Sequence, residues 1–487
     1  MQLRSTLFAL GIMCMLLGLA MVPSALLDIL AGDGRWPIFV SSAFAVTSLG
    51  AALYALTRDE RPPRTGQREA FLLTVLVWVV LPALAAVPFM SWGMSFTDAM
   101  FESISGLTTT GATVLTGLDD LPRGLLLWRA ILQWFGGIGI IVTAIAILPQ
   151  LRVGGMQLFE IESSDQSGKF LPRVTEIAAQ TGLIYLLLTG LCAVLYYQTG
   201  MSDVFSAITH AMTTMAAGGY SIHDDSLGHY QDTAAPWVAI AFMTIAGLPF
   251  SLLALAFFHN RWRGFVSNPQ PRLYIALIVI LSASVFAWLT FGAEIDGDDH
   301  PGLRPLRDTV FSVISVMTGT GYATAGYDGW GTPALVIFLF TMFLGGCAGS
   351  AACGIKMFRL ELSAKAVIAH ASRMVQPHRL IPVRYEGKVV DEDTLQSVMV
   401  FVFLYVATFI IAAMLLSLLG LDPLTAISGA ATSVSNVGPG LGEVIGPDGT
   451  FQTLPDAAKW VCATAMLLGR LEFVAVFVVL SRRFWAG

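Results

Sequence analysis

The chain has 487 residues, of which 55% are hydrophobic and only 12% are charged, and its mean hydropathy is +0.71. So few charged residues cannot cover a surface that faces water, which excludes an ordinary soluble protein. The net charge of −6 does not by itself indicate a class of protein or of partner. The composition is typical of a polytopic membrane protein.

Ten apolar stretches are long enough for transmembrane helices, which need about 20 apolar residues each. They lie near 6–29, 35–57, 69–90, 124–149, 177–198, 235–258, 273–292, 333–358, 395–420 and 458–481. The first stretch could be a cleaved signal peptide. An uncleaved helix is the better interpretation, because nine more stretches follow it.

The basic residues predict the orientation. With a cytoplasmic N-terminus, most of the 27 lysines and arginines fall on the cytoplasmic side, at the N-terminal tip, 58–68, 150–176, 259–272, 356–394 and the C-terminal tail. This asymmetry follows the positive-inside rule, so we expect both termini to be cytoplasmic. The outer side is acidic and would concentrate cations, through Asp119, Asp120, Asp224, Asp225, Glu294, Asp296, Asp298 and Asp299.

Four segments of fourteen residues align without gaps, and each ends on a glycine: Asp98–Gly111, Ser206–Gly219, Asp308–Gly321 and Thr425–Gly438. Six residues before that glycine, each has a hydroxyl residue: Ser105, Thr213, Ser315 and Thr432. Each segment lies on the outer side between two apolar stretches and is too short to cross a membrane. Non-helical backbone at membrane depth is tolerated where it lines a watery cavity. The repeats therefore predict four pore loops around one axis.

We expect an all-α polytopic membrane protein with four pseudo-symmetric helix–pore loop–helix repeats around one pore, preceded by two extra transmembrane helices. The expected units are residues 1–60 for the two leading helices, and 69–150, 176–258, 272–358 and 393–484 for pore repeats 1 to 4.

The chemistry of such a pore comes from the backbone. Rings of carbonyl oxygens replace the hydration shell of a cation, and glycine reaches the φ and ψ values that aim successive carbonyls at one axis. For one copy alone, a glycine-containing turn would be the simpler interpretation, but four equally placed copies favour a filter. The candidate strands are 109–113, 217–221, 319–323 and 436–440, and the third is most similar to the potassium-channel sequence TVGYG. The residues expected to bind K⁺, mainly through backbone carbonyls, are Thr109, Thr110, Gly111, Ala217, Gly218, Gly219, Gly319, Thr320, Gly321, Asn436, Val437 and Gly438.

A run of small residues at 344–356 is too rich in glycine for a stable helix. Close helix packing is one interpretation, but so dense a run is more typical of a broken helix at a permeation site. Because the run follows the third candidate strand, it would lie beneath the filter as a gate. The expected gate residues are Gly345, Gly346, Gly349, Ser350, Gly354, Lys356 and Arg470.

Arg470 stands within the last apolar stretch, where inserting an arginine costs roughly 2.5–3.5 kcal/mol. We expect it to hydrogen-bond the 345–354 loop and to place a positive barrier in the pore. The alternative is a buried structural ion pair. Glu472 is a doubtful partner, because it lies on a different face of the helix.

Other polar and reactive residues predict no further chemistry. His210 is expected to be an ordinary buried, hydrogen-bonded histidine, and the glycines at 136–139 to allow close helix packing. We find no His/Cys metal cluster, P-loop, nucleotide-binding fingerprint or nucleophile–base arrangement, and therefore expect neither an enzyme nor a cofactor held by this chain. The cysteines, expected as free buried thiols, are Cys14, Cys192, Cys347, Cys353 and Cys462.

Several motifs resemble the Trk/Ktr/HKT potassium transporter superfamily, and most of all its TrkH branch. The resemblance covers essentially the whole chain, because two helices before four repeats are a trait of that branch. The motifs are TTGAT at 109–113, GTGYATA at 319–325, NVGPGLG at 436–442, GGCAGS at 345–350, GIK at 354–356, GRLE at 469–472, QWFGGIGI at 133–140 and LRVGGMQLF at 151–159.

The resemblance implies K⁺ uptake across the bacterial cytoplasmic (inner) membrane, because glycine at the key position of all four strands accompanies potassium selectivity in that superfamily. Those positions here are Gly111, Gly219, Gly321 and Gly438. It also implies a homodimer in membrane lipid with one pore per protomer. A cytosolic TrkA-type regulatory subunit that binds NAD or ATP would dock on the basic cytoplasmic face, and no nucleic acid is involved.

The resemblance also implies a gate formed by the 345–354 loop and Arg470. The chain departs from the branch at 351–353, where Ala-Ala-Cys replaces a more glycine-rich loop and would stiffen the gate. Tyr220 replaces a frequent phenylalanine, a change expected to leave selectivity unaltered.

Two rival classes make different predictions. A secondary transporter of another cation or small solute, coupled to Na⁺ or H⁺, predicts inverted repeats and side-chain ligands at the membrane midplane. The four repeats here share one orientation and offer backbone. An integral membrane enzyme would need clustered catalytic side chains at the membrane surface.

Overall fold

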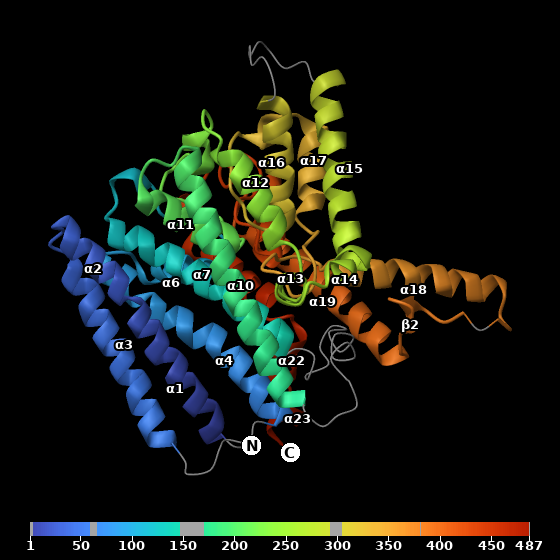
Figure 1. The fold of residues 1–487 in the computed structure, drawn as a ribbon, viewed down its shortest axis with the longest axis horizontal. Helices are drawn as coiled ribbons and strands as arrows, with labels where there is room; N and C mark the ends of the chain where they lie inside the picture. The colour runs from blue at the N-terminus through green and yellow to red at the C-terminus, as the bar shows by residue number, and fades with distance from the viewer. Residues whose placement is uncertain (1–2, 59–65, 147–169, 293–303, 380, 487) are drawn as a thin grey trace.

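The structure is a computed structural model that describes residues 3–58, 66–146, 170–292, 304–379 and 381–486. These residues form a helical body with a single two-stranded hairpin (Figure 1). Among the predictions above, the motif at 151–159 and the acidic residues at 294–299 lie outside the described residues.

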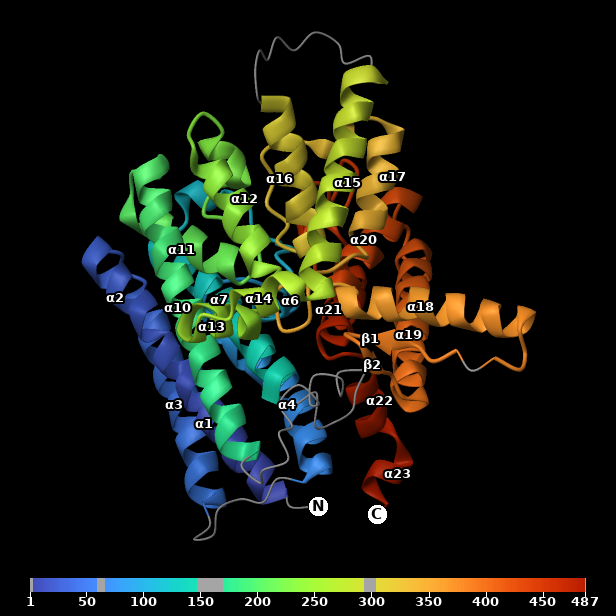
Figure 2. The same ribbon diagram turned by 45° about the vertical axis from the view of Figure 1, so that its right-hand side comes forward.

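The first three helices pack along one side of the body (Figures 1 and 2). Helix α1 (Leu3–Ala20) leads into α2 (Val22–Ala31), and α3 (Trp36–Thr57) returns alongside α1. The two backbones approach closely where two glycines meet, since a Cβ on Gly50 would lie 2.7 Å from the carbonyl oxygen of Gly11. Small residues allow this kind of contact between membrane helices. These are the two extra leading spans that the sequence predicted.

Behind them, one arrangement occurs four times: a long helix, a short helix, a glycine-ended segment and a further helix. The long helices are α4 (Gln67–Ala85) with its continuation α5 (Val87–Trp92), α10 (Phe170–Thr199), α15 (Pro269–Phe291) and α19 (Glu392–Leu418). The short helices are α6 (Phe96–Leu107), α11 (Val204–Met215), α16 (Arg304–Thr318) and α20 (Pro423–Ser435). The following helices are α7 (Arg123–Ala146), α12 (Ala235–Ala246), α17 (Thr332–Thr341) and α21 (Asp456–Arg470).

A 3₁₀ turn follows each glycine-ended segment: η1 (Leu118–Asp120), η2 (Ser226–Tyr230), η3 (Tyr327–Gly329) and η4 (Phe451–Thr453). The remaining helices are α13 (Phe250–His259), α14 (Trp262–Ser267), α18 (Met357–Val375), α22 (Val474–Leu480) and α23 (Arg482–Trp485). The fold is thus all-α, with the pseudo-symmetric repeats that the sequence predicted.

Three of the four short helices begin where the sequence has a capping residue. The side chains of Ser95, Asp203 and Asp422 accept hydrogen bonds from backbone N–H groups in the first turn of α6, α11 and α20. Pro423 then occupies the first position of α20. Such caps satisfy N–H groups that have no partner within the helix, so local sequence sets where these three short helices start.

The ten expected spans need three corrections. Among the described residues, seven helices are long and apolar enough to cross a membrane, and two further candidates are bent pairs. The stretch at 235–258 is broken between α12 and α13, which meet at 96°, and the stretch at 458–481 is broken between α21 and α22, which meet at 103°. The stretch at 333–358 is helical from its start to Thr341 and again only from Met357, the first residue of α18.

Helix α18 projects sideways from the body (Figures 1 and 2). Its base packs on a hairpin in which β1 (Arg384–Tyr385) pairs antiparallel with β2 (Lys388–Val389). Both residues of the two-residue turn, Glu386 and Gly387, have positive φ, as the turn of a tight hairpin requires.

Candidate functional site

The four short helices end in the same way. We call the three residues that close each repeat segment 1 (109–111), segment 2 (217–219), segment 3 (319–321) and segment 4 (436–438). In segment 1, the Thr109 N–H donates to the Gly106 carbonyl at 3.0 Å, and the Thr110 N–H donates to the Ser105 carbonyl at 2.9 Å. The same pair of bonds occurs in segments 2, 3 and 4 at 2.9–3.4 Å. This is the Schellman helix end, and it satisfies carbonyls that the helix leaves unpaired.

Each segment has positive φ at its first and third residues. The first residues are Thr109, Ala217, Gly319 and Asn436, with φ of 50–72°. The third residues are the four aligned glycines, with φ of 74–112°. Three of the first residues are not glycine, so they carry backbone strain that the surrounding contacts must offset.

The four glycines close a ring. A Cβ added to Gly111 would lie 2.1 Å from the Gly218 carbonyl oxygen, and one added to Gly219 would lie 1.7 Å from the Thr320 oxygen. Continuing round, a Cβ on Gly321 would lie 2.1 Å from the Val437 oxygen, and one on Gly438 would lie 2.8 Å from the Thr110 oxygen. Each glycine therefore faces the middle carbonyl of the next segment, in the order 1, 2, 3, 4 and back to 1. All twelve residues predicted from the sequence lie in this ring.

Segments 1 and 3 have the same internal hydroxyl contacts. Ser105 Oγ donates to the Ala112 carbonyl at 2.6 Å, and Ser315 Oγ donates to the Tyr322 carbonyl at 2.7 Å. A threonine pair accompanies each serine: the hydroxyls of Thr108 and Thr110 are 2.7 Å apart, and so are those of Thr318 and Thr320. In both repeats, the hydroxyls that make these contacts belong to the repeat itself.

Segment 2 is held by a residue of another helix. Gln133, on α7, donates from Nε2 to the Gly218 carbonyl at 2.6 Å and accepts from the Tyr220 N–H at 3.0 Å. Gln133 is fully buried, and a Cβ on Gly218 would lie 2.5 Å from its side-chain carbon Cδ. The glycine at 218 therefore provides the space that this amide occupies.

Segment 4 is held by the side chain of its own first residue and by a residue of α19. Asn436 Nδ2 donates to the Thr110 hydroxyl at 2.8 Å and to the Met466 carbonyl at 3.0 Å. Tyr405, on α19, contacts Ser435 Oγ at 2.6 Å. The hydroxyl of Thr432, which aligns with Ser105, has no hydrogen-bond partner within the described part of the chain.

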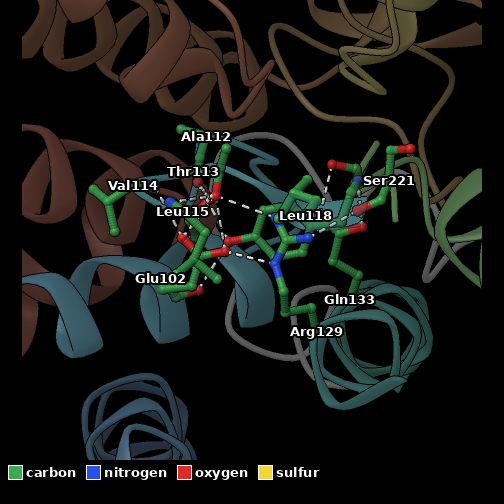
Figure 3. Close-up of polar contacts among 12 residues, drawn as sticks. Glu102, Ala112, Thr113, Val114, Leu115, Leu118, Arg129, Gln133 and Ser221 are labelled. Carbon is green, nitrogen blue, oxygen red and sulfur yellow. Dashed lines mark hydrogen bonds and ion pairs between the residues drawn. The ribbon is translucent and has the colours of Figure 1, made fainter. Parts of the chain in front are cut away.

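A buried ion pair between Glu102 and Arg129 contacts the strand that follows segment 1 (Figure 3). Arg129 Nε donates to Glu102 Oε1 at 2.8 Å, and its Nη1 donates to the Ser221 carbonyl at 2.8 Å. The Glu102 carboxylate accepts from the Thr113 hydroxyl at 3.0 Å and from the Val114 N–H at 3.1 Å. Both charged side chains are at most 2% exposed. The pair joins the strands that follow segments 1 and 2, and the guanidinium also lies 4.1 Å from the ring centroid of Tyr220.

The small-residue run forms an ordered loop between α17 and α18. Leu344 and Ile355 form a parallel bridge, with the Gly345 N–H donating to the Ile355 carbonyl at 3.0 Å. The loop also pairs with the break between α12 and α13, where the Cys347 N–H donates to the Gly247 carbonyl at 2.9 Å. The predicted residues Gly346, Gly349, Ser350 and Gly354 belong to this loop, and Lys356 Nζ donates to the carbonyl of Ala352.

Cys353 is the loop residue that contacts the ring. Its N–H donates to the Thr318 carbonyl at 3.3 Å, and its Sγ lies 3.7 Å from the Thr109 hydroxyl. Arg470 Nη1 donates to the same sulfur at 2.6 Å, as well as reaching the Gly136 carbonyl at 3.4 Å. The predicted contact between Arg470 and the loop is therefore present, and it is made through a thiol that the predicted gate residues did not include.

Arg470 and Glu472 lie at a break after α21, whereas the sequence predicted one straight span through both residues. Arg470 is the last residue of α21 rather than a residue in the middle of a span. Glu472 and Phe473 follow with positive φ, and Glu472 pairs with Arg359 of α18. As expected from the sequence, Glu472 does not pair with Arg470. Its partner is Arg359, to which no feature of the sequence pointed.

The other predicted residues have ordinary roles. His210 is buried, with Nδ1 at 2.8 Å from the Ser206 carbonyl and Nε2 at 3.0 Å from Ser221 Oγ. Gly136 and Gly137 do permit close packing, because Cβ atoms there would lie 1.9 Å from the Leu107 oxygen and 2.9 Å from the Ala216 Cα. Gly139 makes no such contact with any described residue.

One group of side chains that could hold a metal ion was not anticipated from the sequence. Asp119, His223 and His229 offer ligand atoms that all lie within 4.8 Å of one another. Burial, and the neighbouring His223, lower the pKa of His229. The three residues come from the loops of two different repeats, so their spacing in the sequence gave no indication of the cluster.

The chain resembles known transport proteins along its whole length. A family model described as "TrkH: Cation transport protein" matches residues 37–485. The chain belongs to this TrkH family. It is 38% identical over 494 residues to the Trk system potassium uptake protein TrkH of Halomonas elongata, covering 100% of both chains. It is 42% identical over 420 residues to the Trk system potassium uptake protein TrkI of the same organism, covering 86% of this chain and 84% of that protein.

The fold matches a solved structure of the same family. The crystal structure of the potassium transporter TrkH from Vibrio parahaemolyticus superimposes with a TM-score of 0.88 at 34% sequence identity, covering 100% of both chains. Membership in a transport family, rather than in an enzyme family, agrees with the prediction from the motifs.

Proposed function

We propose that this chain is the membrane subunit of a Trk-type potassium uptake system and that the ring of segments 1 to 4 is its selectivity filter. The ring itself carries the proposal, because the middle carbonyls of Thr110, Gly218, Thr320 and Val437 alternate with four glycines around one axis. Carbonyl rings of this kind replace the hydration shell of a dehydrated cation. The relatives named as potassium uptake proteins support K⁺ as the ion.

Ion flux into liposomes that contain the purified protein tests this function. We expect K⁺ and Rb⁺ to enter in preference to Na⁺, and expression of the chain with its regulator to rescue growth of a bacterium deficient in K⁺ uptake. Repeating the flux with and without a pH gradient separates a channel from a proton-coupled transporter. Equal permeation of Na⁺ and K⁺, or failure to rescue, would contradict the proposal.

We further propose that the loop at 345–354 and Arg470 form the gate. The loop lies against the ring through Cys353, and the guanidinium holds the thiol from the other side. Removing the Arg470 side chain removes this contact and a buried positive charge, which would otherwise repel a cation beneath the ring. We expect Arg470→Ala to raise flux in the absence of the regulator, relative to Arg482→Ala as a matched loss of a basic residue. Unchanged flux at normal expression would exclude the gating role.

Membership of the TrkH family supports a proposal for the assembly and the location. We propose a homodimer in the bacterial inner membrane, with both termini cytoplasmic and a TrkA-type nucleotide-binding regulatory subunit on the basic face around 356–394. The beginning of α1 and helix α23 lie at the same end of the body (Figure 1), which supports both termini being on one side. Size measurement of the protein in detergent, with and without the regulator, tests the stoichiometry.

A further inference from the structure

Two histidines and one carboxylate meet on the outer loops, away from the ring. Asp119 belongs to η1 of repeat 1, whereas His223 and His229 belong to the outer loop of repeat 2. We call these three residues the outer His–Asp cluster. Their ligand atoms lie within 4.8 Å of one another. The Asp119 side chain is 50% exposed and that of His223 is 16% exposed, so an ion in the outer solution can reach them.

The surroundings orient His223 toward the cluster. Its Nδ1 contacts Asp119 Oδ1, and its Nε2 lies 2.9 Å from the Tyr230 hydroxyl. One ring nitrogen therefore faces the carboxylate, while the other has a separate partner that fixes the ring. A second partner of this kind is what ligating histidines have in metal sites.

His229 supplies the second imidazole. Its ring is stacked on that of His223 with centroids 3.7 Å apart and an interplanar angle of 1°. Parallel rings direct their in-plane lone pairs along parallel lines, so a shared ion requires the exposed His229 ring to rotate about χ2. His229 is exposed, and besides His223 its ring contacts that of Tyr230, with centroids 4.9 Å apart.

The donor set selects the class of ion. Two imidazole nitrogens and one carboxylate suit a borderline dication such as Zn²⁺. K⁺, Mg²⁺ and Ca²⁺ prefer sets made of oxygen ligands. The cluster is therefore chemically distinct from the carbonyl ring.

We propose that the outer His–Asp cluster is a binding site for Zn²⁺ or a similar transition dication, and that the bound ion reduces cation entry. The second half of this inference rests on the proposed pore. The loops that would hold the ion are attached to the strands of the ring, which makes an effect on entry a direct consequence of binding.

Hydrogen bonds from backbone N–H groups connect the neighbours of the cluster to three of the four repeats. The Asp224 carboxylate, next to His223, accepts from the Leu118 N–H of η1 at 3.2 Å. On η2, next to His229, the Gly228 N–H donates to the Ala323 carbonyl at 3.0 Å. Ala323 follows segment 3 by two residues. A dication at the cluster would therefore tie together the outer loops of repeats 1, 2 and 3, and it would add positive charge to an acidic outer face.

Titration of the full-length protein in lipid nanodiscs with Zn²⁺, followed by calorimetry, tests the site directly. The test variant is His229→Gln, because this side chain is exposed and its loss leaves the core intact. Asp120→Asn controls for the loss of a neighbouring carboxylate outside the cluster, and His370→Gln controls for the loss of an exposed histidine on α18. Mg²⁺ replaces Zn²⁺ in a parallel titration.

We expect one Zn²⁺ per chain, with His229→Gln weakening binding more than about tenfold, since losing even the hydrogen-bond partner of a ligand costs about 10- to 100-fold. Both controls should bind as the unmodified chain does, and Mg²⁺ should not compete. Equal Zn²⁺ affinity in the unmodified chain and in His229→Gln would overturn the site, as would no binding at millimolar Zn²⁺.

Flux measurements test the consequence separately. External Zn²⁺ should lower K⁺ entry into liposomes for the unmodified chain and both controls, and this fractional inhibition should be lost in His229→Gln. Identical inhibition in all four proteins would overturn the link between the cluster and cation entry. If the unmodified chain carries no K⁺ flux, the proposed pore fails, while calorimetry still decides the Zn²⁺ site.

Discussion

Segments 1 and 3 of the ring are held by serine and threonine hydroxyls of their own repeats, whereas segments 2 and 4 are held by other kinds of side chain. Segment 2 is held by an amide on α7, and segment 4 by its own asparagine and a tyrosine on α19. In segments 1 and 3, a serine of the short helix donates to the carbonyl that follows the glycine, at 2.6 and 2.7 Å. In segment 2, the corresponding support comes from Gln133 on α7, and in segment 4 from Asn436 and Tyr405. The backbone of all four segments is nevertheless the same, including both bonds of the helix end.

This difference shows that the four segments can share one backbone conformation although different side chains hold them. The Schellman end and the two positive φ angles set the direction of the carbonyls in every repeat. The side chains behind the strand only have to satisfy its buried polar groups, and different residues can do this. Substitutions at equivalent positions of the four segments should therefore have unequal effects.

The largest effects are expected at the glycines. Gly219→Ala would place Cβ 1.7 Å from the Thr320 oxygen, whereas Gly438→Ala would leave 2.8 Å to the Thr110 oxygen. In both Gly111→Ala and Gly321→Ala, the added Cβ would lie 2.1 Å from the facing carbonyl oxygen. We expect Gly219→Ala to cause the largest loss of K⁺ uptake and of the preference for K⁺ over Na⁺, and Gly438→Ala to cause the smallest. The other two substitutions should cause similar, intermediate losses.

All four substitutions also put alanine at positive φ, which costs on the order of 1–3 kcal/mol each. Rubidium and sodium flux into liposomes measures the size of the loss in each of the four variants. Gly329→Ala is the control, since its Cβ would meet no described atom within 4 Å. Equal losses in all four would show that strain, and not the packing of the ring, dominates.

An intermediate effect is expected at Gln133. Gln133→Leu keeps most of the volume but leaves the Gly218 carbonyl and the Tyr220 N–H without their partner. A buried polar group without a partner costs about 1–3 kcal/mol, so segment 2 should loosen. We expect a lower melting temperature and a weaker preference for K⁺ over Na⁺.

Gln180→Leu, on α10, is the matched control, because the Gln180 amide donates to Glu176 of the same helix and supports no segment of the ring among the described residues. Unaltered selectivity in Gln133→Leu, together with an unaltered melting temperature, would show that segment 2 does not depend on this support.

The smallest effects are expected at the aligned hydroxyls. Ser105→Ala removes the bond to the Ala112 carbonyl and should destabilise the protein by about 1 kcal/mol. Thr432→Val removes a hydroxyl that has no partner among the described residues, so it should be neutral or slightly stabilising. Thermal unfolding in detergent measures both. If Thr432→Val destabilises as much as Ser105→Ala does, the contrast between the two pairs of segments fails.

Much of the fold could be predicted because its signals are local. The four glycines, the hydroxyls six residues before them and the apolar stretches on either side are all matters of spacing along the chain. The break at 247–249 had a visible cause, because Pro249 cannot continue a helix. The break after Arg470 had no glycine or proline to mark it within 470–474.

The supports of the site could not be predicted, because they join residues far apart in the chain. Gln133 reaches segment 2 across 85 residues, Arg470 reaches Cys353 across 117, and His223 reaches Asp119 across 104. Each pairing depends on how the repeats pack around the axis. Only the isolated charge of Arg470 in an apolar stretch gave a usable signal, and it correctly indicated a contact with the loop.

The most direct test of the ring is to locate the ion. Crystals or vitrified particles of the full-length protein in Rb⁺ or Tl⁺ should show heavy-ion density on the axis between the middle carbonyls of Thr110, Gly218, Thr320 and Val437. The same preparation of Gly219→Ala should show this density reduced or displaced. Density at side chains elsewhere in the body, with none on the axis between these carbonyls, would contradict the central claim that this ring selects the ion.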